Sequence, residues 1–170
     1  MRDRKSDYNR HGWACYVAGG LLLCSIAMFF LPFVGSFLEG NRFVSFPVYQ
    51  LVFGGEVIFD NAGHLVAFSF SENYWLFAFA ICLALGALGS FLSRNATREL
   101  IISLSLSTVG FIGVAMALLI THWVNPGLPL MSLKFGWAFY VWVALAGPAL
   151  ILLVIASFRS RAYWRKRSVK

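Results

Sequence analysis

The chain has 170 residues, of which 59% are hydrophobic and only 12% are charged, and its net charge is +7. A soluble domain carries about 25% charged residues, so this composition excludes an ordinary soluble protein and predicts an integral membrane protein. The length allows several membrane spans but no second large domain. We therefore expect a single membrane domain over residues 1–170.

Four runs without Asp, Glu, Lys or Arg are each long enough to cross a bilayer, which takes about 20 helical residues. These runs cover residues 14–34, 74–93, 100–124 and 136–158. Basic residues precede the first run, as in a cleaved signal peptide, but its apolar core exceeds the roughly 7 to 15 residues of such a peptide. We expect a retained helix there. The predicted fold class is an all-α membrane protein, a four-transmembrane-helix bundle.

Lys and Arg are distributed unevenly around these runs. If both termini lie inside, twelve of the fourteen Lys and Arg residues fall on the inner side, and only Arg42 and Lys134 fall outside. Cytoplasmic segments near helix ends are enriched in these residues. The pattern predicts cytoplasmic termini in a plasma membrane or a bacterial cytoplasmic membrane. It also explains the positive net charge without a nucleic-acid partner.

The longest segment outside the predicted spans is the outer loop, residues 35–73. Its residues 43–53 are rich in β-branched and aromatic side chains, which are typical of strands. Gly54-Gly55 predicts a hairpin turn, and a second turn signal at 61–63 precedes a stretch of alternating apolar residues. We expect a small extracytoplasmic β-meander of three strands in this loop.

Such a small sheet is marginally stable alone, so its aromatic residues must pack on something. The protein's own helices, the lipid interface and a partner protein are the three alternatives. An exposed aromatic patch on an outer loop would mark an interaction site. The residues predicted to bind a partner are Phe43, Phe46, Tyr49, Phe53, Phe59, Phe68 and Phe70.

Small residues spaced four apart recur within the second and third predicted helices. This spacing lets a neighbouring helix approach closely, either within the bundle or from another subunit. The predicted packing residues are Gly86, Ser90, Ser103, Ser107, Gly113 and Ala117.

The tail, residues 159–170, is strongly basic. Basic clusters directly inside a membrane helix attract anionic headgroups by about 1 kcal/mol per charge. The residues predicted to contact anionic lipid at the inner face are Arg159, Arg161, Arg165, Lys166 and Arg167.

The sequence offers no recognisable reaction chemistry. No ionisable residue that would mark an ion path lies inside a predicted span, and the residue that comes closest is His122, near the outer end of the third span. The outer acids Glu39, Glu56, Asp60 and Glu72, together with His64, have spacings that match no metal-ligand pattern. No Ser or Cys has the setting of an activated nucleophile. We expect no enzyme, no cofactor and no metal site, and we expect the three cysteines to be packing residues.

Four helices, a longer β-rich first outer loop and a short second one resemble the layout of claudin-type membrane proteins. The first loop of that family carries a Trp-rich signature and a Cys pair, whereas residues 35–73 contain neither Trp nor Cys. The layout therefore assigns no family. The sequence favours a non-enzymatic accessory or assembly subunit that binds other membrane proteins, as a hetero-complex or homo-oligomer. The alternative is a small oligomeric transporter or channel for a neutral solute or lipid.

Overall fold

The structure is a computed structural model, which describes residues 3–38, 42–61, 64–70, 72–93, 97–124 and 134–168. It describes the side chains of residues 13–35, 46–56, 58, 72–93, 98–118 and 135–160. The chain is mostly helical, and four of its helices are long and apolar enough to cross a membrane. The prediction of a multi-pass membrane protein is confirmed in the number, length and apolar composition of these helices.

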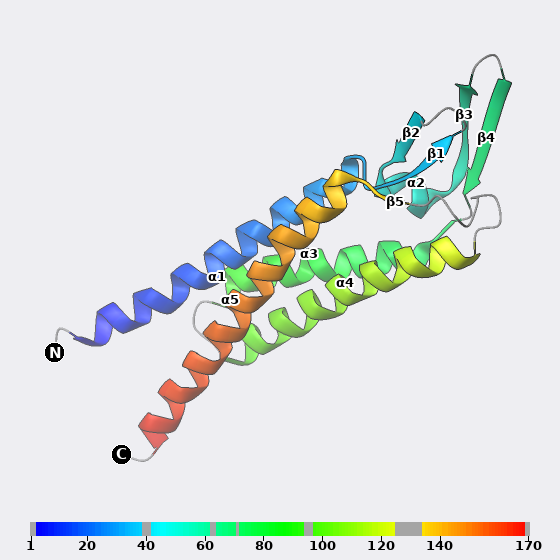
Figure 1. Ribbon diagram of the computed structural model, residues 1–170. Coiled ribbons are helices and arrows are strands. Elements are labelled where there is room, and N and C mark those ends of the chain that lie inside the picture. The colour runs from blue at the N-terminus through cyan, green and yellow to red at the C-terminus, as the bar shows by residue number, and fades with distance from the viewer. Residues whose placement is uncertain are drawn as a thin grey trace.

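The four long helices are α1 (Asp3–Ala27), α3 (Tyr74–Leu92), α4 (Thr97–Val124) and α5 (Trp137–Ser168). The parts suited to a membrane are Trp13–Phe30, Tyr74–Leu92, Arg98–Leu118 and Trp137–Ser160. Helices α1 and α4 each pack against both α3 and α5. Both chain termini lie at one end of these helices, here called the terminal end, and all strands lie at the other, the strand end (Figure 1).

The first apolar run leaves the helical conformation earlier than expected. Helix α1 passes into a 3₁₀ turn, η1 (Met28–Phe30), and Leu31 is already extended, with φ −105° and ψ 168°. The cause is Pro32, because proline disfavours helical conformation in the residue before it and has no N–H for the helix. Val34 begins a strand. The predicted helix boundary at residue 34 is therefore wrong.

The helices enclose a core of fully buried apolar side chains. Leu22, Leu83, Val114, Trp142 and Leu153 are each 0% exposed and come from all four long helices. Helix α3 begins with an N-cap, because the Asn73 side chain accepts a hydrogen bond of 3.1 Å from the Leu76 N–H.

One small sheet joins segments that are far apart in the sequence. Strand β1 (Val34–Leu38) lies between β2 (Arg42–Phe46) and β5 (Lys134–Phe135), and both neighbours are antiparallel to it. The Gly136 N–H donates to the Phe33 carbonyl at 2.8 Å. A Cβ at Gly136 would lie 2.9 Å from the Pro32 carbonyl carbon, so the close approach needs glycine. The start of α5 is thereby fastened to the segment that follows α1.

The expected three-stranded meander is not the arrangement found. Residues Val48–Phe53 form a short helix, α2, instead of continuing the strand that ends at Phe46. Gly54 and Gly55 have φ of 68° and 125°, so they turn the chain out of α2 into β3 (Gly55–Asn61) rather than joining two strands. Strand β3 pairs in antiparallel fashion with β4 (His64–Phe70) as a separate two-stranded sheet. Pro47 has no N–H for a strand ladder, which separates β2 from α2.

Candidate functional site

Of the seven aromatic residues that the sequence predicts as partner contacts, three have described side chains, and these three lie in different settings. Phe46 is 2% exposed and belongs to the core, so its prediction as a partner contact is wrong. Tyr49 and Phe53 are 45% and 64% exposed, and both lie on α2. The remaining four lie in strands, and their side chains are outside the described part: Phe43 in β2, Phe59 in β3, and Phe68 and Phe70 in β4.

At the strand end, helix α2 lies against η1, which follows α1, and against α3. Its C-terminal part is tied to the start of α3, because the Asn73 N–H donates to the Val52 carbonyl at 3.0 Å. The ring centroids of Tyr49 and Phe30 are 6.4 Å apart, and those of Phe53 and Phe77 are 6.1 Å apart. Helix α2 therefore bridges the end of α1 and the first turn of α3.

The hairpin β3–β4 has little support from the rest of the described chain. Its strands contact each other extensively, but each makes few or no contacts with any other described element. The register pairs apolar residues repeatedly: Val57 with Phe68, Phe59 with Val66, and Ile58 with Ala67. Ile58 is 59% exposed. In Figure 1 the hairpin extends beyond the ends of the long helices.

Aromatic rings from three parts of the chain surround Trp142 on α5. The Trp142 ring stacks on Phe111, with centroids 4.7 Å apart and planes inclined by 20°. Phe29, Phe33 and Phe139 approach the same indole at 5.8 to 6.2 Å. The Trp142 Nε1–H is fully buried and has no acceptor among the described residues. Sequence reasoning missed Trp142 because nothing in the fourth predicted span distinguishes it from the apolar residues around it.

The predicted packing residues lie mainly where α3 meets α4. The Ser103 hydroxyl donates to the Gly86 carbonyl at 2.6 Å, and a Cβ at Gly86 would lie 2.7 Å from the Ser107 backbone nitrogen. Gly113 faces the Phe79 ring in the same contact. Ser90 instead faces Gly19 on α1, while Ala117 is buried. All six are buried within this one chain.

The basic tail continues α5 rather than leaving it. The α5 backbone is helical to Ser168, which includes the positions of all five predicted lipid-contacting residues. Arg159 is exposed, and the side chains of Arg161, Arg165, Lys166 and Arg167 are outside the described part. Contact with anionic lipid stays a prediction.

Described ionisable groups are few. Within the part of the chain that the structure describes, no three His, Cys, Asp or Glu side chains lie close enough together to hold a metal. Of the outer acids, Glu56 and Glu72 are exposed, and the Tyr74 hydroxyl donates to the Glu72 carboxylate. Glu39 lies outside the described residues, as do the side chains of Asp60, His64 and His122.

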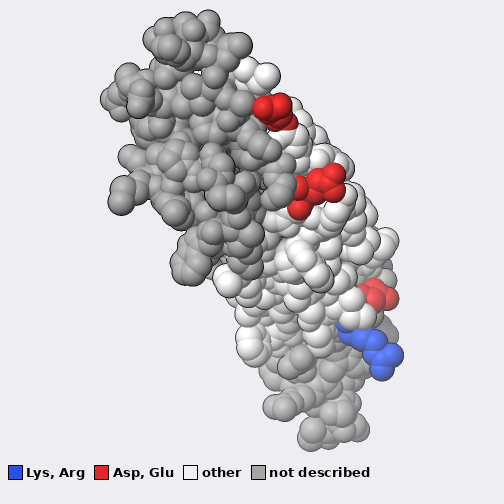
Figure 2. Space-filling view, turned by 90° about the vertical axis from the view of Figure 1, so that its right-hand side faces the viewer, with Lys and Arg blue, Asp and Glu red and all other residues white. Residues whose placement is uncertain are grey.

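Figure 2 shows how the described charges are arranged on one face of the molecule. A broad band without Asp, Glu, Lys or Arg separates acidic side chains toward one end from an acidic and a basic group near the other. Such a band is what a bilayer requires of the surface it surrounds.

Comparison of the chain with protein-family models, with curated proteins and with solved structures finds no match. Any functional proposal must therefore come from this molecule's own residues.

Proposed function

We propose that this protein is a non-enzymatic accessory or assembly subunit, which binds another membrane protein through the hairpin β3–β4 and through the apolar outer faces of its helices. The termini are proposed to be cytoplasmic, in a plasma membrane or bacterial cytoplasmic membrane, because of the Lys and Arg distribution.

The observation that supports this proposal best is the hairpin. It pairs apolar residues at its three central positions and has few contacts with other described elements. An isolated two-stranded hairpin is marginally stable in water, and its open edges can pair with a strand of another chain. A partner strand or surface would supply the missing contacts.

The helices provide a second, broader surface for a membrane partner. Only 28% of the α3 span and 33% of the α1 and α5 spans are buried inside the chain. Large apolar side chains such as Ile81, Leu85 and Leu88 follow the exposed side of α3. Lipid or a partner helix would cover them.

The test is purification of the tagged full-length chain in several mild detergents, with the native mass and all companion chains measured. We expect a stoichiometric companion chain, and we expect the double variant Phe59→Ser/Phe68→Ser to lose it. Phe158→Ser is the matched control, because Phe158 is 69% exposed on α5, far along the helix from the strands.

A pure homo-oligomer without any companion would contradict the accessory role and favour the transporter alternative. A companion retained by the hairpin double variant would show that the hairpin is not the binding site.

A further inference from the structure

We propose that α2 is an interfacial helix, whose Tyr49 and Phe53 side lies in the boundary between headgroups and acyl chains of the leaflet at the strand end. The ligand of this surface is lipid rather than protein. The inference goes beyond the proposed partner binding and holds whether or not the hairpin binds a partner.

The first observation is that α2 is almost entirely apolar. Val48, Leu51 and Val52 are at most 5% exposed and face the protein, while Tyr49 and Phe53 are exposed. The only strongly polar side chain among its six residues is that of Gln50, which is half-buried. A helix that is apolar all round does not face water on either side.

The second observation is continuity with the membrane-spanning surface. Tyr49 lies beside Phe30, which is 70% exposed at the end of the first span, and Phe53 lies beside Phe77, which is 46% exposed on α3. Lipid that covers Phe30 and Phe77 must also reach the two α2 rings. The exposed side of α2 is therefore an extension of the lipid-facing surface.

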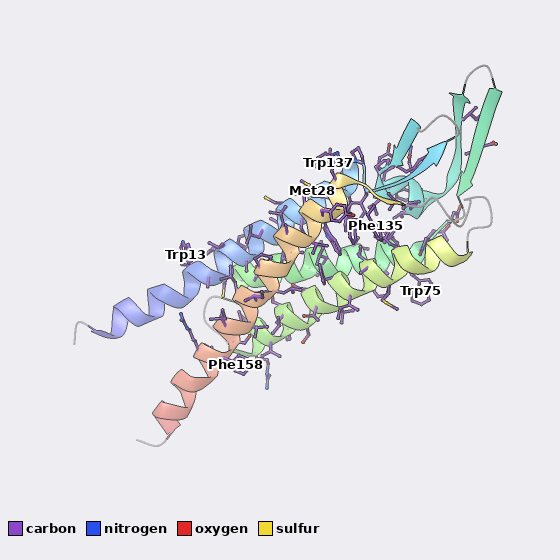
Figure 3. The ribbon with its side chains drawn as sticks, in the orientation of Figure 1. Trp13, Met28, Trp75, Phe135, Trp137 and Phe158 are labelled. Carbon is purple, nitrogen blue, oxygen red and sulfur yellow. The ribbon has the colours of Figure 1, made fainter. Side chains whose placement is uncertain are left out.

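The third observation is the level of α2 along the helices. Trp75 and Trp137 are 74% and 55% exposed at the strand end, while Trp13 and Phe158 lie toward the terminal end (Figure 3). Tryptophan side chains gather where a bilayer meets water, and Phe158 marks the last apolar turns of α5 at the other end. From Trp137 to Phe158 the helix rises about 32 Å at roughly 1.5 Å per residue, close to the hydrocarbon thickness of about 30 Å. Helix α2 contacts η1 and the start of α3, so it lies at about the same depth along the helices as Trp75 and Trp137.

The fourth observation marks where water begins. Glu56 is exposed three residues after Phe53, and Glu72 is exposed two residues before Tyr74. Glu56 follows α2 and Glu72 precedes α3, and both carboxylates would lie in the aqueous layer, because a charge within the hydrocarbon costs several kcal/mol. The membrane surface should therefore pass between Phe53 and Glu56, and the hairpin β3–β4 begins just above it.

The test uses the full-length chain with Cys15, Cys24 and Cys82 replaced by alanine and one new cysteine at position 49, 53 or 56. Each variant carries an environment-sensitive fluorophore in phosphatidylcholine nanodiscs, where both membrane faces are accessible. Quenching by a lipid with a nitroxide near its headgroup is compared with quenching by aqueous iodide. For Tyr49→Cys and Phe53→Cys we expect severalfold stronger lipid quenching than for Glu56→Cys, and the reverse order with iodide.

Iodide quenching at positions 49 and 53 as strong as at 56 would overturn the proposal. So would protection from both quenchers, since a protein surface would then cover α2. Because labelled variants can misfold, the unmodified chain is also tested in nanodiscs with a photoreactive lipid whose diazirine lies near the headgroup. Lipid adducts on the α2 peptide but not on the β3–β4 peptide support the proposal, and their absence from α2 contradicts it.

Discussion

The contact between α3 and α4 and the hairpin β3–β4 are packed in opposite ways. At the first, Gly86 and Gly110 let two backbones come so close that a Cβ at Gly110 would lie 2.6 Å from the Leu83 nitrogen. In the hairpin, the two strands contact each other extensively and make few contacts with other described elements. The difference indicates that α3 and α4 find tight packing against each other within this chain, while the hairpin finds few such contacts there.

The largest expected effect lies in the helical core. Trp142→Ala should lower the free energy of unfolding by about 3–5 kcal/mol, because it opens a large cavity among the rings that surround Trp142. Trp142→Phe should cost far less, since it keeps a ring and removes a buried N–H that has no described acceptor, a group that costs about 1–3 kcal/mol. Denaturant unfolding in micelles measures both. Equal losses would contradict this account of the indole.

Gly86→Ala is expected to destabilise by about 1–3 kcal/mol, because its methyl group would push the α4 backbone away from α3. Gly20→Ala is the matched control, since nothing lies within 4 Å of a Cβ at Gly20. Thermal unfolding of the two variants in the same detergent gives the comparison. If both variants unfold at the same temperature as the wild type, the backbones of α3 and α4 are not in tight contact at Gly86.

A smaller effect is expected for Ser103→Ala, which removes the hydrogen bond to the Gly86 carbonyl. Hydrogen bonds between membrane helices contribute about 0.6 kcal/mol on average. The same unfolding assay should resolve this value next to the Gly86 variant. A loss as large as that of Gly86→Ala would mean that the hydrogen bond, not the close approach, holds the pair together.

The smallest effect on stability belongs to the hairpin. Phe59→Ser/Phe68→Ser should change the unfolding free energy of the isolated chain by no more than about 0.5 kcal/mol, as for surface substitutions elsewhere. The double variant should instead reduce the amount of companion chain that copurifies. A large loss of stability in the isolated protein would show that the hairpin packs on its own helices.

All four membrane helices could be placed from the sequence, because long uncharged runs leave a chain few other options. The end of the first helix was predicted too late in the sequence, because Pro32 favours the extended conformation of Leu31 and so ends the helix early. Helix α2 could not be distinguished from a strand, since a short apolar run has no decisive periodicity. The contacts of α2 with Phe30 and Phe77, and the pairing of β5 with β1, join residues far apart in the sequence, so local sequence patterns could not predict them.

Part of the candidate site was also visible in the sequence. The aromatic character of residues 43–70 indicated an interaction surface, but composition alone did not separate buried Phe46 from exposed Phe53. Small residues marked the α3–α4 contact because four-residue spacing places them on one helix face. Trp142 carried no comparable signal.

Hydrogen–deuterium exchange of the isolated protein in nanodiscs tests the central claim most directly. The amides of β3 and β4 should exchange much faster than those in the middle of α3 and α4, and they should become protected when the companion chain is bound. Hairpin amides as protected as the helix amides in the isolated chain would contradict the claim that the hairpin depends on a partner.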